Sequence, residues 1–229
     1  MNADRVHRRV PLIGPYSKMK RMRTQWIWRL GLAILLPLWG QAPSKMVLLI
    51  IGPPGSGKTT QAAKLKGKYK IPSISMADIL KKEGGAKSDL SRRLKVNLAG
   101  DLVSDEVANQ LIDKRLQRKD VAQGFILDGY PVTEKQAAYL DAMLAQRGLP
   151  TPVVIHLSAP DNVVVERMNQ RGRSDDTPEA MNRRLEEYHI QSKAVLQRYG
   201  AGHLKTIDAT KTPDEVWRAI QQALGETRK

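Results

Sequence analysis

Short hydrophobic runs alternate along the chain with longer stretches in which hydrophobic and polar residues are mixed. The hydrophobic runs, which predict buried strands, cover residues 47–51, 71–75, 125–127, 153–157 and 204–207. Each stretch between them is long enough for at least one helix. Strands that alternate with helices are typical of an α/β fold, in which a parallel sheet carries helices on both faces. Ligands of such sheets bind at the carboxyl ends of the strands.

Residues that favour helix termini predict where the helices lie. The predicted N-caps are Ser104, Thr133, Asp161, Thr177 and Thr212, because a short polar side chain there accepts a hydrogen bond from the first turn. Two of these caps precede a proline, which suits the first helical position. The helices are expected over residues 59–68, from 105 to about 118, from 134 to about 147, from 161 to about 170, from 178 to about 198 with Gly200 closing it, and from 213 onward.

One glycine-rich run lies between the first predicted strand and the first predicted helix. It reads Gly52-Pro53-Pro54-Gly55-Ser56-Gly57-Lys58-Thr59-Thr60 and fits the pattern G-x-x-x-x-G-K-[ST]. In this strand–loop–helix context the pattern predicts a nucleoside triphosphate site. The glycines let several backbone N–H groups converge on one anion, and the helix N-terminus adds partial positive charge. Lys58 would bind the outer phosphates, and the hydroxyl of Thr59 or Thr60 would bind Mg²⁺.

Composition is compatible with a single globular domain and excludes thiolate chemistry. The chain has 229 residues, of which 41% are hydrophobic and 27% are charged. It has no cysteine, so disulfides and cysteine-ligated zinc are excluded. The net charge of +15 suits a protein that binds phosphates. Nucleic-acid binding is not required, because aromatic residues make up only 5% of the chain and no recognition motif appears.

The first 45 residues differ from the remainder of the chain in charge and in hydrophobic pattern. They carry nine Lys or Arg against one acid, a net charge of +8, and include the uncharged run LGLAILLPLWG at residues 30–40. A secretory signal peptide fits this order, although Pro43 disfavours cleavage after Ala42. A spanning anchor needs about 20 apolar residues, more than this run supplies. The third interpretation, which we favour, is that this segment is an extension and not part of the working domain. Any contact of the protein with a membrane would come only from this segment.

Several further blocks resemble the adenylate kinase family. Besides the glycine-rich run and the Thr60-Gln61-Ala62 that follows it, they are ISMADIL at 74–80, GDLVSDE at 100–106, GFILDGYP at 124–131, RGRSDDT at 171–177, RL at 184–185 and IDAT at 207–210. They follow the family's order and spacing from Met46 to the end of the chain. The resemblance implies one domain over residues 46–229, with a five-stranded parallel sheet of the P-loop NTPase type. It also implies a nucleoside-monophosphate-binding part at about 75–104 and a short lid at about 171–177, without zinc.

The resemblance also implies roles for individual residues. Catalytic roles fall to Lys58, Asp128, Arg171, Arg173 and Arg184; Asp128 would bind Mg²⁺ through water, together with Thr59. ATP would be bound by Gly52, Gly55, Ser56, Gly57, Lys58, Thr59, Thr60, Arg167 and Lys211, with Arg167 stacked on the adenine. Arginines suit this chemistry, since a transferred phosphoryl group carries spread negative charge that a planar guanidinium can bind through two N–H groups. Asp175 and Asp176 would pair with these arginines at the lid hinge, or else act as N-terminal helix acids.

The acceptor side departs from the family. The implied monophosphate site contains Met76, Lys81, Leu102, Val103, Gly129, Val132, Gln136, Arg173 and Arg184. Val132 and Lys81 stand where the family has arginines, and Met76-Ala77 replaces Thr-Gly. Losing an arginine–phosphate pair should weaken acceptor binding by tenfold or more, because each charge-assisted hydrogen bond is worth about 1.5–3 kcal/mol. Gln136 retains the position that reads the adenine edge in the family, which favours AMP.

Three functions therefore follow from the sequence. The first is phosphoryl transfer from MgATP to AMP, giving two ADP, by a monomer in the cytoplasm. The second is the same chemistry with another nucleoside monophosphate. The third is an ATP-binding protein whose transfer activity is impaired, because the donor side is intact and the acceptor side is altered.

Overall fold

The fold is built on a five-stranded parallel sheet. The computed structural model describes residues 45–84, 103–172 and 177–226. Its strands are β1 (Met46–Ile51), β2 (Ser73–Ser75), β3 (Gly124–Asp128), β4 (Val153–Ser158) and β5 (Leu204–Asp208), in the spatial order β2-β3-β1-β4-β5. Every neighbouring pair is parallel. The predicted α/β fold with a five-stranded parallel sheet is confirmed.

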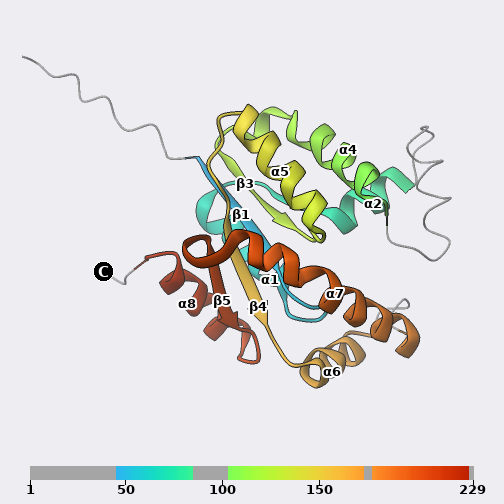
Figure 1. Ribbon diagram of the computed structural model, residues 1–229. Coiled ribbons are helices and arrows are strands. Elements are labelled where there is room, and N and C mark those ends of the chain that lie inside the picture. Colours follow the sequence, from blue (N-terminus) through green and yellow to red (C-terminus); the bar gives the residue numbers. More distant parts are fainter. Residues whose placement is uncertain (1–44, 85–102, 173–176, 227–229) are drawn as a thin grey trace, which may run out of the picture. The chain divides into compact units, whose positions relative to one another are not determined.

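Helices connect the strands and cover both faces of the sheet (Figure 1). They are α1 (Lys58–Tyr69), α2 (Met76–Gly84), α4 (Asp105–Leu116), the short 3₁₀ helix η1 (Lys119–Val121), α5 (Glu134–Gln146), α6 (Asp161–Arg171), α7 (Pro178–His203) and α8 (Pro213–Ala223). Because β1 is central and buried on both sides, Val47 to Ile50 are at most 2% exposed. This explains why the strand is a continuous hydrophobic run instead of an alternating one.

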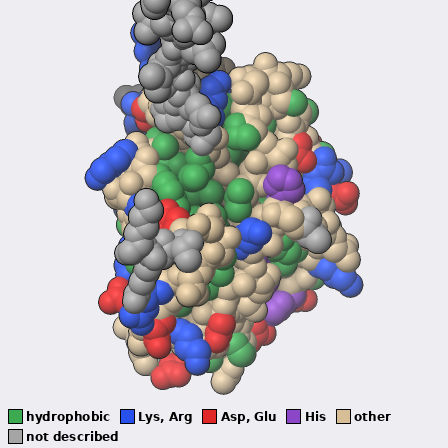
Figure 2. All heavy atoms as spheres, turned by 90° about the vertical axis from the view of Figure 1, so that its left-hand side faces the viewer, with side chains coloured by type: hydrophobic (Ala, Val, Ile, Leu, Met, Phe, Trp, Pro, Cys, Tyr) green, Lys and Arg blue, Asp and Glu red, His purple; other side chains and the backbone are tan. Residues whose placement is uncertain are grey.

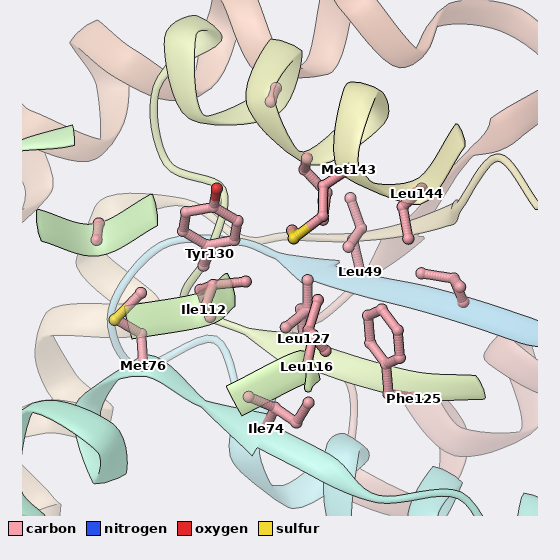
Figure 3. Close-up of a cluster of buried hydrophobic side chains, with 14 of the residues drawn as sticks. Leu49, Ile74, Met76, Ile112, Leu116, Phe125, Leu127, Tyr130, Met143 and Leu144 are labelled. Carbon is pink, nitrogen blue, oxygen red and sulfur yellow. The ribbon is translucent and has the colours of Figure 1, made fainter. Parts of the chain in front are cut away.

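Two separate hydrophobic cores lie on the two faces of the sheet. On one face, side chains of α4, α5 and α7 pack on the sheet around Leu49, Phe125 and Leu127 (Figure 3). On the other face, α1 and α8 pack around Leu48 and Ile50. Successive residues of β1 therefore contribute to opposite cores, as the two-residue period of a strand requires.

Strands β1 and β3 approach each other closely at their first residues. Gly124 opens β3 with a φ of 123°, and a Cβ at this position would lie 2.0 Å from the carbonyl oxygen of Met46. Only glycine can therefore occupy position 124 beside Met46.

Figure 2 shows the face that looks to the left in Figure 1, where hydrophobic side chains gather around the centre. No helix in residues 45–84, 103–172 and 177–226 is long and apolar enough to cross a membrane.

Most of the predicted helix starts are confirmed. Ser104, Thr133, Thr177 and Thr212 are N-caps, and each side chain accepts a hydrogen bond from a backbone N–H three residues later. The cap at Thr212 is a full capping box with Glu215. These helix starts follow local rules, because the cap and its partner are neighbours in the sequence.

Other boundary predictions are wrong. Asp161 is not an N-cap: Pro160 holds that position, and Asp161 is the first residue of α6, where its carboxylate lies 2.9 Å from Nε2 of His189. Helix α7 does not end near residue 198 but continues to His203, with Gly200 included at a φ of 46°. Strand β2 begins at Ser73 instead of residue 71. The contact between Asp161 and His189 joins residues 28 apart in the sequence, which a local cap pattern does not reveal.

Candidate active site

The glycine-rich run forms a loop between the carboxyl end of β1 and the N-terminus of α1. Gly55 and Gly57 have φ angles of 81° and 90°, which side chains rarely adopt. Gly52 lies so close to β4 that an added Cβ would be 2.6 Å from the carbonyl oxygen of Leu157. Gly57 caps α1 without a side-chain hydrogen bond. The N–H groups of the first turn of α1 are thus available to an anion, as predicted for a phosphate loop.

Lys58 lies across this loop. Its Nζ donates hydrogen bonds to the carbonyl oxygens of Gly52 and Pro53, each at 2.8 Å. The pKa of Lys58 is lowered to about 8, mainly because the ammonium is buried; the nearby Arg171 contributes to the lowering, whereas the carboxylate of Asp128 opposes it. The ammonium is therefore held inside the loop, next to where an anion would enter, in surroundings that a bound phosphate would make more favourable for its charge.

Thr59 and Asp128 connect the loop to the neighbouring strand. The hydroxyl of Thr59 donates a 2.9 Å hydrogen bond to Oδ2 of Asp128, the last residue of β3. Asp128 is only 6% exposed. Burial raises the pKa of its carboxyl group, and Asp78 raises it further, while Lys58 and the Thr59 hydrogen bond lower it. A hydroxyl and a carboxylate side by side are the hard oxygen donors that Mg²⁺ prefers, so the predicted metal residues fit that ion.

The loop also contains a buried polar atom. The Oγ of Ser56 is buried and has no hydrogen-bond partner within the described part of the chain. Thr59 and Thr60 are both exposed in the first turn of α1, but the hydrogen bond to the buried carboxylate of Asp128 comes from Thr59.

Arg167 is held by a loop that follows β5. Its guanidinium donates to the carbonyl oxygens of Ala209 at 2.6 Å, Thr210 at 3.1 Å and Lys211 at 3.3 Å. This loop is itself ordered by Asp208, whose carboxylate accepts from the N–H and the hydroxyl of Thr210. Helix α6 and the loop after β5 are thereby joined beside the phosphate loop, since Gly55 packs against Val164 of α6. Lys211 itself is exposed.

Of the other predicted arginines, the structure describes Arg171 on α6 and Arg184 on α7. Arg171 is the last residue of α6, and its charge lowers the pKa of Lys58. Arg184 is half-buried on α7. Arg173, Asp175 and Asp176 lie outside the described residues. Gly172 ends α6 in a left-handed conformation and Thr177 caps α7, so the connecting segment runs from 172 to 177, close to the lid predicted at about 171–177.

Residues predicted to bind the acceptor line the turn after β3 and the start of α2. Gly129 has a φ of 78°, and the bond between Tyr130 and Pro131 is cis. Val132 is 36% exposed. Lys81 is exposed on α2, Val103 packs against the core on the α4 side of the sheet, and Leu102 lies outside the described residues. Met76 is 8% exposed and packs in that same core (Figure 3).

Gln136 is buried and both ends of its side chain are engaged. It is 2% exposed. Its Oε1 accepts from the N–H of Val132 at 2.9 Å, and its Nε2 donates to Oδ1 of Asp105 at 2.9 Å. In this structure Gln136 therefore braces the turn that contains Val132.

Two carboxylates near the site had no site role in the sequence prediction. Asp78, in the first turn of α2, is close enough to Asp128 to raise its pKa. Asp105 is the first residue of α4, where an acid suits the helix N-terminus. Its contact with Gln136, 31 residues away in the sequence, is one that no local pattern reveals.

This fold and loop define a nucleotide-binding protein of the phosphate-loop class. The family model described as adenylate kinase matches residues 50–203. Adenylate kinases of Xanthomonas campestris pv. campestris (strain B100) and Xylella fastidiosa (strain M12) are each 44% identical over 186 residues, which cover 79% of this chain and 100% of the relative. The adenylate kinase of Brucella anthropi is 41% identical over 191 residues, covering 78% of this chain and 98% of the relative. The chain belongs to the adenylate kinase family, and it is a phosphotransferase enzyme of the nucleoside monophosphate kinase type.

Proposed function

We propose that this enzyme transfers the γ-phosphoryl group of MgATP to AMP, reversibly, and forms two molecules of ADP. The observation that carries the proposal is the arrangement at the carboxyl ends of β1 and β3, where Lys58, Thr59 and Asp128 surround the phosphate loop. The names of the relatives support AMP as the acceptor.

In the proposed reaction, an oxygen of the AMP phosphate attacks the γ-phosphorus of ATP. The bond between that phosphorus and the oxygen bridging it to the β-phosphorus breaks, and ADP leaves with this oxygen. No side chain needs to act as a base, since the attacking phosphate is already anionic. The protein contributes position and positive charge: the loop N–H groups and Lys58 bind the donor phosphates, and Arg171, Arg173 and Arg184 bind the group in transfer.

Thr59 and Asp128 would hold Mg²⁺, Asp128 through water. The ion would neutralise phosphate charge during transfer. The residues fit this role because their oxygens are already in contact, at 2.9 Å. Among the described residues no group of three or more His, Cys, Asp or Glu side chains could hold a metal ion.

The donor base is proposed to lie against Arg167. Three backbone carbonyls fix the guanidinium of this residue, so its flat face has a defined orientation for stacking. Lys211 would contribute to the same part of the ATP site. On the acceptor side, the turn from Gly129 to Val132 and Gln136 would bind AMP, with the exposed Lys81 on α2 as a replacement cation.

We further propose that residues 46–229 form the catalytic domain, that residues 1–45 are not needed for it, and that the enzyme is a cytoplasmic monomer. The matched family region begins at residue 50, and the first strand begins at Met46. A chain restricted to residues 46–229 should match the full chain in kcat and in both KM values. Size-exclusion chromatography with light scattering should give the mass of one chain for the shorter form; a dimer mass would contradict the monomer.

The test is to incubate the full chain with MgATP and, separately, AMP, CMP, UMP or GMP, and to separate the products by anion-exchange chromatography. ADP formed fastest with AMP supports the proposal, whereas faster turnover with another monophosphate would assign a different acceptor. Lys58→Ala should lower kcat by roughly 10²–10³-fold, as for removal of one transition-state contact. Lys45→Ala, a lysine just before β1, is the control and should leave kcat unchanged.

A second candidate is supported by one observation. Val132 exposes a hydrophobic side chain where the family has an arginine, so acceptor binding could have been lost while ATP binding remained. ATP binding by isothermal titration with no turnover on any of the four monophosphates would establish this alternative and overturn the kinase proposal.

A further inference from the structure

Helix α4 presents two polar side chains to the turn after β3. Asp105 and Asn109 are four residues apart, so they lie on one face of the helix. Asn109 accepts a 2.7 Å hydrogen bond from the hydroxyl of Tyr130, whose ring packs in the core beside Met76 and Ile112 (Figure 3). Asp105 contacts the other end of the same turn. The first two turns of α4 therefore hold the segment from 130 to 136 at two points.

The contact at Asp105 is a small network centred on one oxygen. Oδ1 of Asp105 accepts from the hydroxyl of Thr133 at 2.8 Å and from Nε2 of Gln136 at 2.9 Å. The same hydroxyl accepts from the N–H of Gln136 and caps α5. A carboxylate can only accept hydrogen bonds, so it requires Nε2 of Gln136 to face it. The orientation of the Gln136 amide is thereby determined.

The orientation of the Gln136 amide also determines a hydrogen bond of the Val132 backbone. Because Nε2 of Gln136 faces Asp105, Oε1 is directed to the N–H of Val132 and accepts from it at 2.9 Å. If the amide turned over, a donor would meet a donor at Val132 and an acceptor would meet an acceptor at Asp105. Asp105 thus fixes the peptide of Val132 through one buried side chain.

We infer that Asp105 is a positioning residue for the acceptor site, acting through Gln136 on the turn from Gly129 to Val132. The inference rests on the proposed function, which places the acceptor at this turn. Because Val132 offers no charged side chain, binding on this side depends on backbone groups and on Gln136. The turn carries no positively charged side chain that could keep the acceptor phosphate bound if these backbone groups were displaced. Acceptor binding should therefore be sensitive to substitutions of Asp105.

The experiment measures kcat and the KM values for AMP and ATP in the full chain. Asp105→Ser keeps a residue that suits a helix start but is too short to reach Gln136, and it should raise KM for AMP about tenfold while KM for ATP stays within about twofold. Asp105→Asn retains an oxygen that can accept both hydrogen bonds, and it should restore KM for AMP to within about threefold of the original. Thermal unfolding of each variant reports whether it folds.

Asn109→Ala is the matched control, since it removes the other contact between the same helix and the same turn but keeps the hydrogen bonds of the Gln136 side chain and the bond from the Tyr130 hydroxyl to the Gln136 carbonyl. It should lower the melting temperature but leave KM for AMP unchanged.

The inference is overturned if Asp105→Ser leaves KM for AMP unchanged, if it raises both KM values together, or if Asn109→Ala raises KM for AMP equally. Should Asp105→Ser fail to fold, Asp105→Thr takes its place, since its side chain is also too short to reach Gln136: the inference requires a raised KM for AMP in Asp105→Thr and not in Asp105→Asn. A lack of turnover by the unsubstituted chain would instead overturn the proposed function, and the inference with it.

Discussion

The hydroxyl of Thr59 and the carboxylate of Asp128 are hydrogen-bonded across 2.9 Å, although 69 residues separate them in the chain. The bond joins the first turn of α1 to the end of β3 and places a buried negative charge beside the phosphate loop. Burial and neighbouring charges shift the pKa of Asp128 upward and that of Lys58 downward to about 8. Opposed shifts of two adjacent groups are typical of functional sites.

Asp128→Asn should lower kcat by roughly 10²-fold and raise the Mg²⁺ concentration needed for half-maximal activity, because the amide has no charge to hold the hydrated ion. The Thr59 hydrogen bond can persist to the amide oxygen, so the melting temperature should fall little. Activity measured across a Mg²⁺ titration checks this. Asp120→Asn, in an exposed ion pair with Arg115, is the control and should change neither quantity appreciably. Equal Mg²⁺ dependence of both variants would contradict a metal role for Asp128.

Arg167→Lys should raise KM for ATP about tenfold and leave KM for AMP unchanged. A lysine cannot reproduce the planar group that three carbonyls of residues 209–211 hold, so both the orientation and the stacking face are lost. Steady-state kinetics with each substrate varied in turn measures the two constants. Arg183→Lys, an exposed arginine on α7, should behave like the original chain. A rise in KM for AMP instead would place Arg167 on the acceptor side.

Val132→Arg should lower KM for AMP by tenfold or more, because it introduces a guanidinium that can bind the acceptor phosphate through two hydrogen bonds. The side chain at 132 is 36% exposed, so a longer residue has room to extend into solvent or toward a ligand. Tyr139→Arg adds the same charge at another exposed hydrophobic position, on α5, and should leave KM unchanged. If both substitutions lower KM equally, the gain comes from net charge and not from position 132.

His156 should make the fold less stable as pH falls. Burial lowers the pKa of this imidazole, whose Nε2 lies 2.9 Å from the hydroxyl of Tyr188. The unfolded chain therefore binds a proton at this residue more readily than the folded chain does. The contribution of neutral His156 is fully present above the ordinary histidine pKa of about 6.5 and is lost as pH falls below it toward the depressed folded value.

Melting temperatures measured between pH 7.5 and 5.5 test this expectation. His156→Gln should show a weaker fall on acidification than the original chain, because the titrating group is gone. His203→Gln removes an exposed histidine at the end of α7 and should keep the original pH dependence. The same slope in the original chain and in His156→Gln would exclude His156 as the source.

The amino-acid sequence determined the features that depend on neighbouring residues. The phosphate loop, the continuous hydrophobic strands and the four confirmed N-caps all lie within short contiguous segments, so local rules were sufficient to place them. The order of these elements then led to the parallel sheet and to its ligand-binding edge.

The tertiary structure decided which distant side chains meet. Asp105 looked like an ordinary first-turn acid until its contact with Gln136 was known, and Asp161 looked like a cap although it pairs with His189 on α7. The length of α7 also escaped prediction, since Gly200 signals a stop but the helix continues to His203. The partners of Asp105 and Asp161 are 31 and 28 residues away, and a pattern along the chain carries no information about such partners.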